Sequence, residues 1–269
     1  MKTKTFLAAA AATTLALSIA SCSGDSPSTP AENADTNVVQ SAESPQSEEE
    51  AEEGPTEAEL MAYFEALGSE DPKIIREAVE LAAPGSNAEA YAIYYAAARQ
   101  AGRDAGYPTE STAVKRTEGG FSLCPELETG EDECFDYTNI QHEGDQIADF
   151  YVGDDPLAGR LSLGSGEAQP LGELGEATMI AAYRSVGGYV VTVFEIKSSS
   201  EGLWPIATYL APDGRQSDVT LMDGPVDLSS GALANYAFYF EGAEFGGEVL
   251  IEAIDELGQS SGSVSFQTQ

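Results

Sequence analysis

The sequence contains very few of the side chains that most catalytic and metal sites require. Its 269 residues include one histidine, His142, and three cysteines. A zinc site with two or three histidine ligands therefore cannot form, and no P-loop, G-x-S-x-G, H-E-x-x-H or strand-linked G-x-G-x-x-G pattern occurs. His142 falls in an expected turn, IQHEGD, where an exposed side chain is a more ordinary interpretation than the general base of a triad. The sequence thus predicts no catalytic residue, no metal site and no cofactor.

Basic residues are also scarce. Twelve lysines and arginines stand against 46 aspartates and glutamates, which gives a formal net charge of −34. A field of this sign repels nucleic acid and anionic lipid head groups. The composition therefore excludes nucleic-acid binding and favours cationic partners.

The first 21 residues have the parts of an export signal. Lys2 and Lys4 precede the uncharged apolar run FLAAAAATTLALSIA, residues 6–20. This run is too short to span a bilayer comfortably as a mature helix, so its removal is the better interpretation. An ordinary secretory signal with a cleavage site nearby is one alternative.

Cys22 follows the apolar run directly, and the residues Ile19-Ala20-Ser21-Cys22 resemble the lipobox of bacterial lipoproteins. In that family the signal is cut before the cysteine, whose thiol and new amino terminus are then acylated. The resemblance implies a palmitate-type anchor on Cys22 and a place on the extracytoplasmic face of the cell membrane. Each buried CH₂ of such chains adds about 0.8 kcal/mol to membrane binding without any span. Removal of the signal leaves ten basic residues against 46 acidic ones, a net charge of −36.

The other two cysteines, Cys124 and Cys134, remain to pair with each other. An exported protein meets oxidising conditions, so we expect a disulfide between them. Five of the nine residues between them, PELETGEDE, are acidic. A calcium loop is one interpretation, but the D-x-[DN]-x-[DN]-G spacing is absent. We therefore prefer a solvated acidic hairpin tip in residues 125–133.

Residues 23–55 contain no aromatic and no basic residue. Low hydrophobicity combined with high net charge predicts a disordered segment. A flexible coil of this length averages about 30 Å from end to end, so residues 22–55 are expected to tether a folded part to the membrane. The acidic run EEEAEE, residues 48–53, could instead be a docking tail for a basic partner.

From Thr56 onward the pattern predicts three helices. Thr56 and Glu59 form a capping box for TEAELMAYFEALG, a second helix begins at Asp71-Pro72 and ends before Pro84-Gly85, and the third is AEAYAIYYAAARQAGRD. Beyond Pro108 the period changes to two. Strands are expected near 112–118, 120–124, 134–141, 146–152 and 159–163, with a turn at Glu143-Gly144-Asp145. Residues 56–163 are therefore expected to form an α+β domain, three helices followed by an antiparallel sheet.

The runs EALGSEDPKIIREAVELAAPGS and GDQIADFYVGDDPLAGRL resemble a shape that recurs in envelope proteins of Gram-positive bacteria. More loosely, residues 56–163 resemble the nuclear-transport-factor-2-like fold, in which a curved sheet wraps helices around a pocket. That resemblance implies a pocket but transfers no catalytic motif. The domain has more tyrosines than one small core needs, and buried hydroxyls require partners. Core packing is the more ordinary interpretation; the candidates for a pocket are Tyr63, Tyr94, Tyr95, Tyr137 and Tyr151.

Residues 164–174 form a glycine-rich connector, and the rest of the chain has a strand pattern. Strands are expected near 177–184, 188–197, 204–211, 217–222, 233–240, 247–255 and 262–267. Seven short strands in residues 175–269 predict an all-β sandwich. This part resembles the immunoglobulin-like domains of bacterial lipoproteins but has no cysteine for an inter-sheet disulfide. Trp204 is expected to anchor its core, with a surface aromatic contact as the alternative.

Three functions fit these features. The first is a non-enzymatic surface lipoprotein that contacts an envelope protein or a cationic ligand. The second is a small-molecule carrier or enzyme that uses an aromatic pocket in residues 56–163. The third is an anionic spacer, in which residues 23–55 matter more than the folded part. The absence of catalytic motifs favours the first.

Overall fold

The computed structural model describes residues 54–125 and 134–269. The predicted signal, Cys22, most of the predicted tether and nearly all of the acidic loop lie outside the described residues. Residues 54 onward belong to one compact unit. No helix within the described ranges is long and apolar enough to cross a membrane.

Four helices open the described chain, and their starts follow the capping signals. They are α1 (Glu57–Gly68), α2 (Pro72–Ile75), α3 (Ala78–Leu81) and α4 (Asn87–Asp104). At the start of α1, the Thr56 side chain accepts a hydrogen bond from the Glu59 amide, and the Glu59 carboxylate accepts one from the Thr56 amide. The Ser86 side chain caps α4 in a similar way, with the Glu89 amide as donor. These contacts satisfy amides that have no partner inside a helix.

The second predicted helix is broken into α2 and α3. Backbone hydrogen bonds between these two turns run from residue i to residue i−3, as from the Glu77 amide to the Ile74 carbonyl at 2.8 Å. In such a tight turn the side chains of residues i and i+3 lie on the same side. Ile75 and Ala78 can therefore both be buried, and both are.

An antiparallel sheet follows the helices, with its strands in chain order. They are β1 (Ala113–Arg116), β2 (Gly120–Cys124), β3 (Phe135–Glu143), β4 (Gln146–Val152) and β5 (Asp155–Pro156). The predicted turn joins β3 to β4, and Gly144 takes the positive φ of 59° that this turn needs. The predicted disulfide between Cys124 and Cys134 is confirmed, and it closes the connection from β2 to β3.

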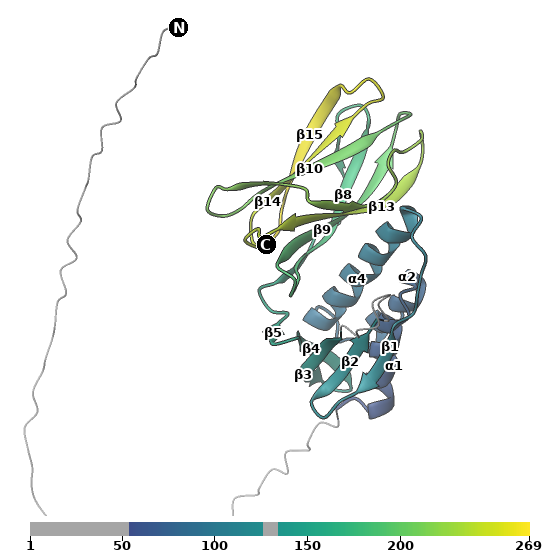
Figure 1. The fold of residues 1–269 in the computed structure, drawn as a ribbon, viewed down its shortest axis with the longest axis vertical. Coiled ribbons are helices and arrows are strands. Elements are labelled where there is room, and N and C mark those ends of the chain that lie inside the picture. Colours follow the sequence, from purple (N-terminus) through teal and green to yellow (C-terminus); the bar gives the residue numbers. More distant parts are fainter. Residues whose placement is uncertain (1–53, 126–133) are drawn as a thin grey trace, which may run out of the picture. The chain divides into compact units, whose positions relative to one another are not determined.

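Two further antiparallel sheets form a sandwich. Its strands are β6 (Leu161–Leu163), β7 (Gln169–Pro170), β8 (Gly175–Arg184), β9 (Tyr189–Ser198), β10 (Trp204–Leu210), β11 (Gln216–Asp218), β12 (Leu221–Asp223), β13 (Leu233–Glu241), β14 (Glu248–Ile254) and β15 (Ser260–Gln267). One sheet has the order β11-β10-β14-β15. The other has the order β12-β13-β9-β8-β6, with β7 also paired to β8. The predicted fold class, helices and an antiparallel sheet followed by an all-β sandwich, is confirmed (Figure 1).

Several details of the sandwich differ from the prediction. The strand expected near 159–163 in the first sheet is β6, which instead pairs with β8 of the sandwich, and β7 lies within the predicted connector at 164–174. The strand expected near 217–222 is split into β11 and β12, which belong to opposite sheets. Trp204 was expected in the core, but it is 48% exposed, so that expectation is wrong. Side chains alternate along β10, and Pro205 takes the buried position while Trp204 points outward.

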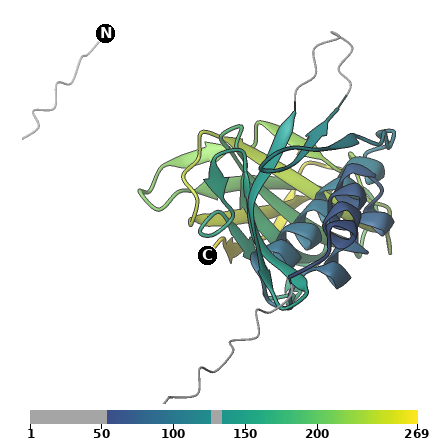
Figure 2. The same ribbon diagram turned by 90° about the horizontal axis from the view of Figure 1, so that it is seen from below.

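Helix α4 lies across the outer face of the six-stranded sheet, as Figures 1 and 2 show. One buried cluster combines residues of the helices and the first sheet with Ala181, Tyr183, Val191, Val193 and Ala237 of the sandwich. A second cluster fills the space between the two sandwich sheets. The six-stranded sheet is therefore buried on both faces, and the first cluster contains residues from both sides of the connector at 164–174.

Candidate functional site

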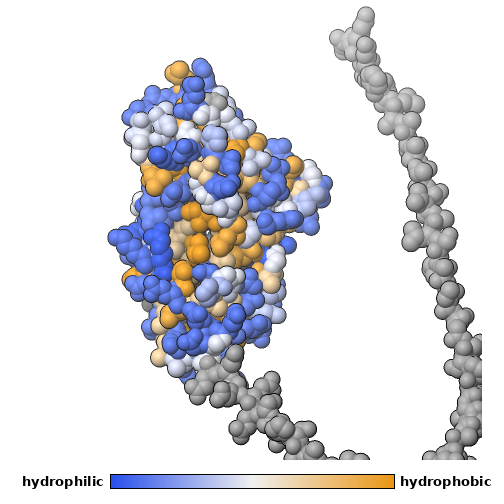
Figure 3. All heavy atoms as spheres, turned by 180° about the vertical axis from the view of Figure 1, so that it is seen from behind, coloured by the Kyte–Doolittle hydropathy of each residue, from blue (hydrophilic) through white to orange (hydrophobic). Residues whose placement is uncertain are grey.

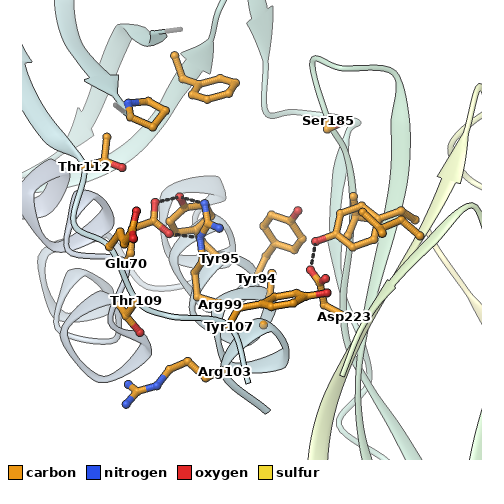
Figure 4. A pocket seen from close by; sticks show the side chains of 18 of the residues that line it. Glu70, Tyr94, Tyr95, Arg99, Arg103, Tyr107, Thr109, Thr112, Ser185 and Asp223 are labelled. Atoms are coloured by element: carbon orange, nitrogen blue, oxygen red, sulfur yellow. Dashed lines mark hydrogen bonds and ion pairs between the residues drawn. The ribbon is translucent and has the colours of Figure 1, made fainter. Parts of the chain in front are cut away.

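A cleft lies where α4 meets the edge of the sandwich (Figure 4). Its walls come from α4, from the segment 107–112 that follows this helix, and from β9, β12 and β13. Its volume is about 720 Å³. Pockets that bind small molecules have volumes of roughly 300–1,000 Å³, so the cleft is large enough for such a ligand.

The α4 wall is formed by two rows of side chains at helical spacing. Tyr94, Ala98 and Gly102 make one row, and Tyr95, Arg99 and Arg103 make the other. Residues four apart lie above one another on a helix, so both rows face the cleft together. A Cβ atom at Gly102 would lie 3.6 Å from the Tyr107 ring, an ordinary van der Waals distance, so this part of the wall has room for an alanine.

Three side chains form a hydrogen-bonded group at one end of the cleft. The Tyr95 hydroxyl donates to the Glu70 carboxylate at 2.8 Å, and Arg99 Nη2 donates to the Tyr95 hydroxyl at 2.6 Å. Arg99 also forms an ion pair with Glu70, and its guanidinium lies 4.7 Å from the centroid of the Tyr95 ring. Burial raises the pKa of the Glu70 carboxyl, although Arg99 and Tyr95 act in the opposite direction.

The opposite wall is built around Asp223 of β12. The Tyr239 hydroxyl donates to Asp223 Oδ2 at 2.8 Å, and the Tyr189 ring lies edge-on to the Tyr239 ring with centroids 6.4 Å apart. Burial, and then the nearby Asp223 carboxylate, raise the pKa of the Tyr239 phenol. This phenol therefore stays neutral at physiological pH and remains a hydrogen-bond donor.

Most charges that line the cleft are paired. Arg99 is paired with Glu70, and Arg103 is paired with Asp71 at 3.1 Å. Within the described part of the chain, no basic side chain is paired with Asp223 or with Glu110, which also lines the cleft. The cleft thus combines aromatic walls with an excess of negative charge.

The structure brings together only two of the five tyrosines predicted for a pocket. Tyr94 and Tyr95 line the cleft. Tyr63 is fully buried and donates to the Ala88 carbonyl at 2.8 Å, and the buried Tyr137 hydroxyl lies 3.3 Å from that of Tyr91. Tyr151 is half-buried on β4 and does not line the cleft.

Comparisons with known proteins identify no family for this chain. No protein family model matches it, and no curated protein matches it. A solved structure with some likeness is the archaellum periplasmic stator protein FlaG from Sulfolobus acidocaldarius, with 13% identity and a TM-score of 0.24. The match covers 35% of this chain and 100% of that chain. A TM-score this low supports no statement about fold or function, so the site has to be interpreted from its own geometry.

Several cleft residues were missed by sequence analysis, chiefly Glu70, Tyr107, Asp223 and Tyr239. A signal for Tyr239 exists in the run NYAFYF, where aromatic or apolar residues occupy both sets of alternating positions. Such a run indicates a strand that is buried on both faces. It implies that something covers the second face, and α4 does so.

Other parts of the described chain have fewer features of a functional site. His142 is exposed, with its Nδ1 atom 3.2 Å from the Gly144 carbonyl oxygen. Within residues 54–125 and 134–269, no group of three histidine, cysteine or acidic side chains could hold a metal ion. A smaller hollow of about 320 Å³ lies on another side of α4, lined by Val79, Ile93 and Ile180 among others. On the face seen in Figure 3, apolar residues gather near the middle of the folded part, and its two ends are mostly hydrophilic.

Proposed function

We propose that this protein is a lipid-anchored extracytoplasmic binding protein that holds a small ligand in the cleft beside α4. The observation that carries the proposal is the cleft itself, with its tyrosine-lined walls and convergent polar groups. Ligand sites typically combine apolar or aromatic walls with a few placed polar groups. The absence of a catalytic constellation in the sequence favours binding over catalysis.

The location is supported by two features. The lipobox-like residues before Cys22 imply acylation and membrane anchoring. The Cys124–Cys134 disulfide fits an oxidising, extracytoplasmic compartment, where such bonds persist. Substitution of Cys22→Ala is expected to release the protein from the membrane into the medium. Unchanged membrane retention of this variant would contradict the anchor.

Binding can be tested with a variant that fills the cleft. Ala98 lies on the α4 wall, so Ala98→Trp should block the site, whereas Ala158→Trp adds the same side chain at an exposed position outside the cleft. The full-length proteins are incubated with the small-molecule fraction of a cell-envelope extract and examined by native mass spectrometry. We expect a bound mass on the wild type and on Ala158→Trp, but not on Ala98→Trp. No bound mass on the wild type would refute the proposal.

A second candidate function is contact with an envelope protein through the outer face of the four-stranded sheet. Trp204, Ile206 and Leu210 are exposed at alternate positions of β10, and the exposed Leu250 of β14 pairs with Thr208 on the same face. Trp204 is the only tryptophan in the chain. A blue shift of its fluorescence on addition of envelope proteins would support this contact, and unchanged emission would argue against it.

A further inference from the structure

The charges of the cleft are unevenly balanced. Glu70 is neutralised by Arg99, and Arg103 lies against Asp71. The carboxylate of Asp223 is half-buried and receives only the neutral Tyr239 hydroxyl among the contacts described for it. A carboxylate that is partly removed from water gains from a cation more than an exposed one does. A positively charged ligand group bound next to Asp223 would therefore stabilise its carboxylate.

Several aromatic rings lie on the cleft side of this carboxylate. Figure 4 shows Tyr94 and Tyr107 beside Asp223, on the side of the cleft away from Glu70. Tyr239 is hydrogen-bonded to Asp223, and Tyr189 packs against Tyr239. Neutral phenol rings attract a cation to their faces through their quadrupoles. The carboxylate and the rings thus favour the same kind of charge.

The geometry points to an organic cation as the ligand of this cleft, with an ammonium or quaternary ammonium group held between Asp223 and the rings of Tyr94, Tyr107 and Tyr239. This inference rests on the proposed binding function and specifies its ligand class. The rest of the ligand would lie along the α4 wall toward Tyr95, in a volume of about 720 Å³.

Other ligand classes fit less well. An anion would meet the unpaired carboxylates of Asp223 and Glu110, inside a protein whose formal net charge is −34. A metal ion prefers several oxygen ligands, and the described residues contain no cluster of three acidic, histidine or cysteine side chains. A neutral ligand would leave the Asp223 charge unpaired in a less polar environment than water. An organic cation satisfies both the carboxylate and the rings.

Two probes of nearly equal shape can test the charge requirement. Choline carries a quaternary ammonium group, and 3,3-dimethylbutan-1-ol replaces its charged nitrogen with carbon. Binding of each probe to the full-length protein is measured by titration calorimetry at low ionic strength. We expect choline to bind at least about tenfold more tightly than its neutral analogue, and to bind more weakly as salt is added because the charge is screened.

Variants can test whether choline binds in the cleft next to Asp223. Asp223→Asn keeps an acceptor for the Tyr239 hydroxyl but removes the charge, and Tyr107→Leu removes an exposed ring without touching the core. Each is expected to weaken choline binding by about tenfold. Glu241→Gln removes an equal charge from an exposed position on the same strand as Tyr239 and should leave binding unchanged. The inference also predicts that Ala98→Trp abolishes choline binding.

The possible results separate this inference from the proposed function. Equal binding of choline and its neutral analogue, lost in Ala98→Trp, would overturn the cation inference and leave the binding function standing. Choline binding that survives Asp223→Asn would also overturn it. If choline does not bind at all, the inference is wrong, and the native mass spectrometry described above decides separately whether the cleft binds another class of ligand.

Discussion

The contact between α4 and the sandwich can be tested at a single hydrogen bond. The Asn235 amide of β13 donates to Asp104 Oδ2 at 2.7 Å, at the end of α4. β12 covers this edge of β13 only from Ala237 to Tyr239, so no strand supplies an acceptor for Asn235. The Asp104 carboxylate accepts this hydrogen bond instead. Gln100 Nε2 donates a hydrogen bond to the other carboxylate oxygen, Asp104 Oδ1, at 2.8 Å.

Substitution of Asp104→Ala should leave the largely buried Asn235 amide without an acceptor. A hydrogen bond to a charged group contributes about 1.5–3 kcal/mol to stability. For a folded unit of this size, each kcal/mol shifts Tm by roughly 2–4 °C, so we expect a decrease of about 3–12 °C. Asp104→Asn keeps an oxygen acceptor and should lose less stability than Asp104→Ala. The free energy of unfolding is measured by urea denaturation, and Tm by calorimetry.

The control for Asp104→Ala is Glu167→Ala, which removes an equal charge from an exposed position. Exposed substitutions of this kind usually change stability by less than about 0.5 kcal/mol. If the two variants have the same stability, the Asp104 contact does not hold α4 to β13. A change confined to one of two separate unfolding transitions would likewise contradict our reasoning, because a shared core predicts one transition.

Three more outcomes are expected. Gly102→Ala should stabilise the protein by about 0.5–1 kcal/mol in urea denaturation, because its Cβ has room in α4 and alanine has the higher helix propensity; a loss of stability would contradict this. The double variant Cys124→Ser, Cys134→Ser should lose roughly 2.5–3 kcal/mol, and a reducing agent should destabilise only the wild type; an equal effect on both would count against the disulfide. Because burial raises the pKa of Glu70 in the folded state, the folded protein holds this proton more tightly than the unfolded chain. The wild type should therefore lose stability relative to Glu70→Gln as pH rises from about 4 toward neutrality, and parallel pH profiles would refute this.

Local signals in the sequence predicted most of the fold. The capping box of Thr56 and Glu59 marked the start of α1 correctly, and the third predicted helix is α4, which Ser86 caps. The run NYAFYF has aromatic residues at every second position, and these residues, Tyr236, Phe238 and Phe240, fill the sandwich. The break between α2 and α3 was missed because nothing in the run PKIIREAVEL, which has no glycine and no proline after its first residue, marks where the backbone tightens. No local pattern contains that information.

The cleft was less predictable, because its residues are far apart in the chain. Tyr94 and Tyr95 were found as part of a helical tyrosine pattern. Asp223 lies about 130 residues further on, and only the docking of α4 on β13 brings it near them. Sequence patterns report periodicity within one element. They do not report which elements become neighbours, so the residues that complete the site had no signal of their own.

The division of one expected strand into β11 and β12 also affects how readily the sheet edges can pair with other chains. Each piece has only three residues, and each forms an edge of its sheet. Long, flat edges offer unpaired amides and carbonyls to strands of other chains, which leads to aggregation. By changing sheets, the chain gives each sheet an edge strand of only three residues on this side of the sandwich. Short edge strands of this kind limit pairing between the sheets of separate copies of the protein.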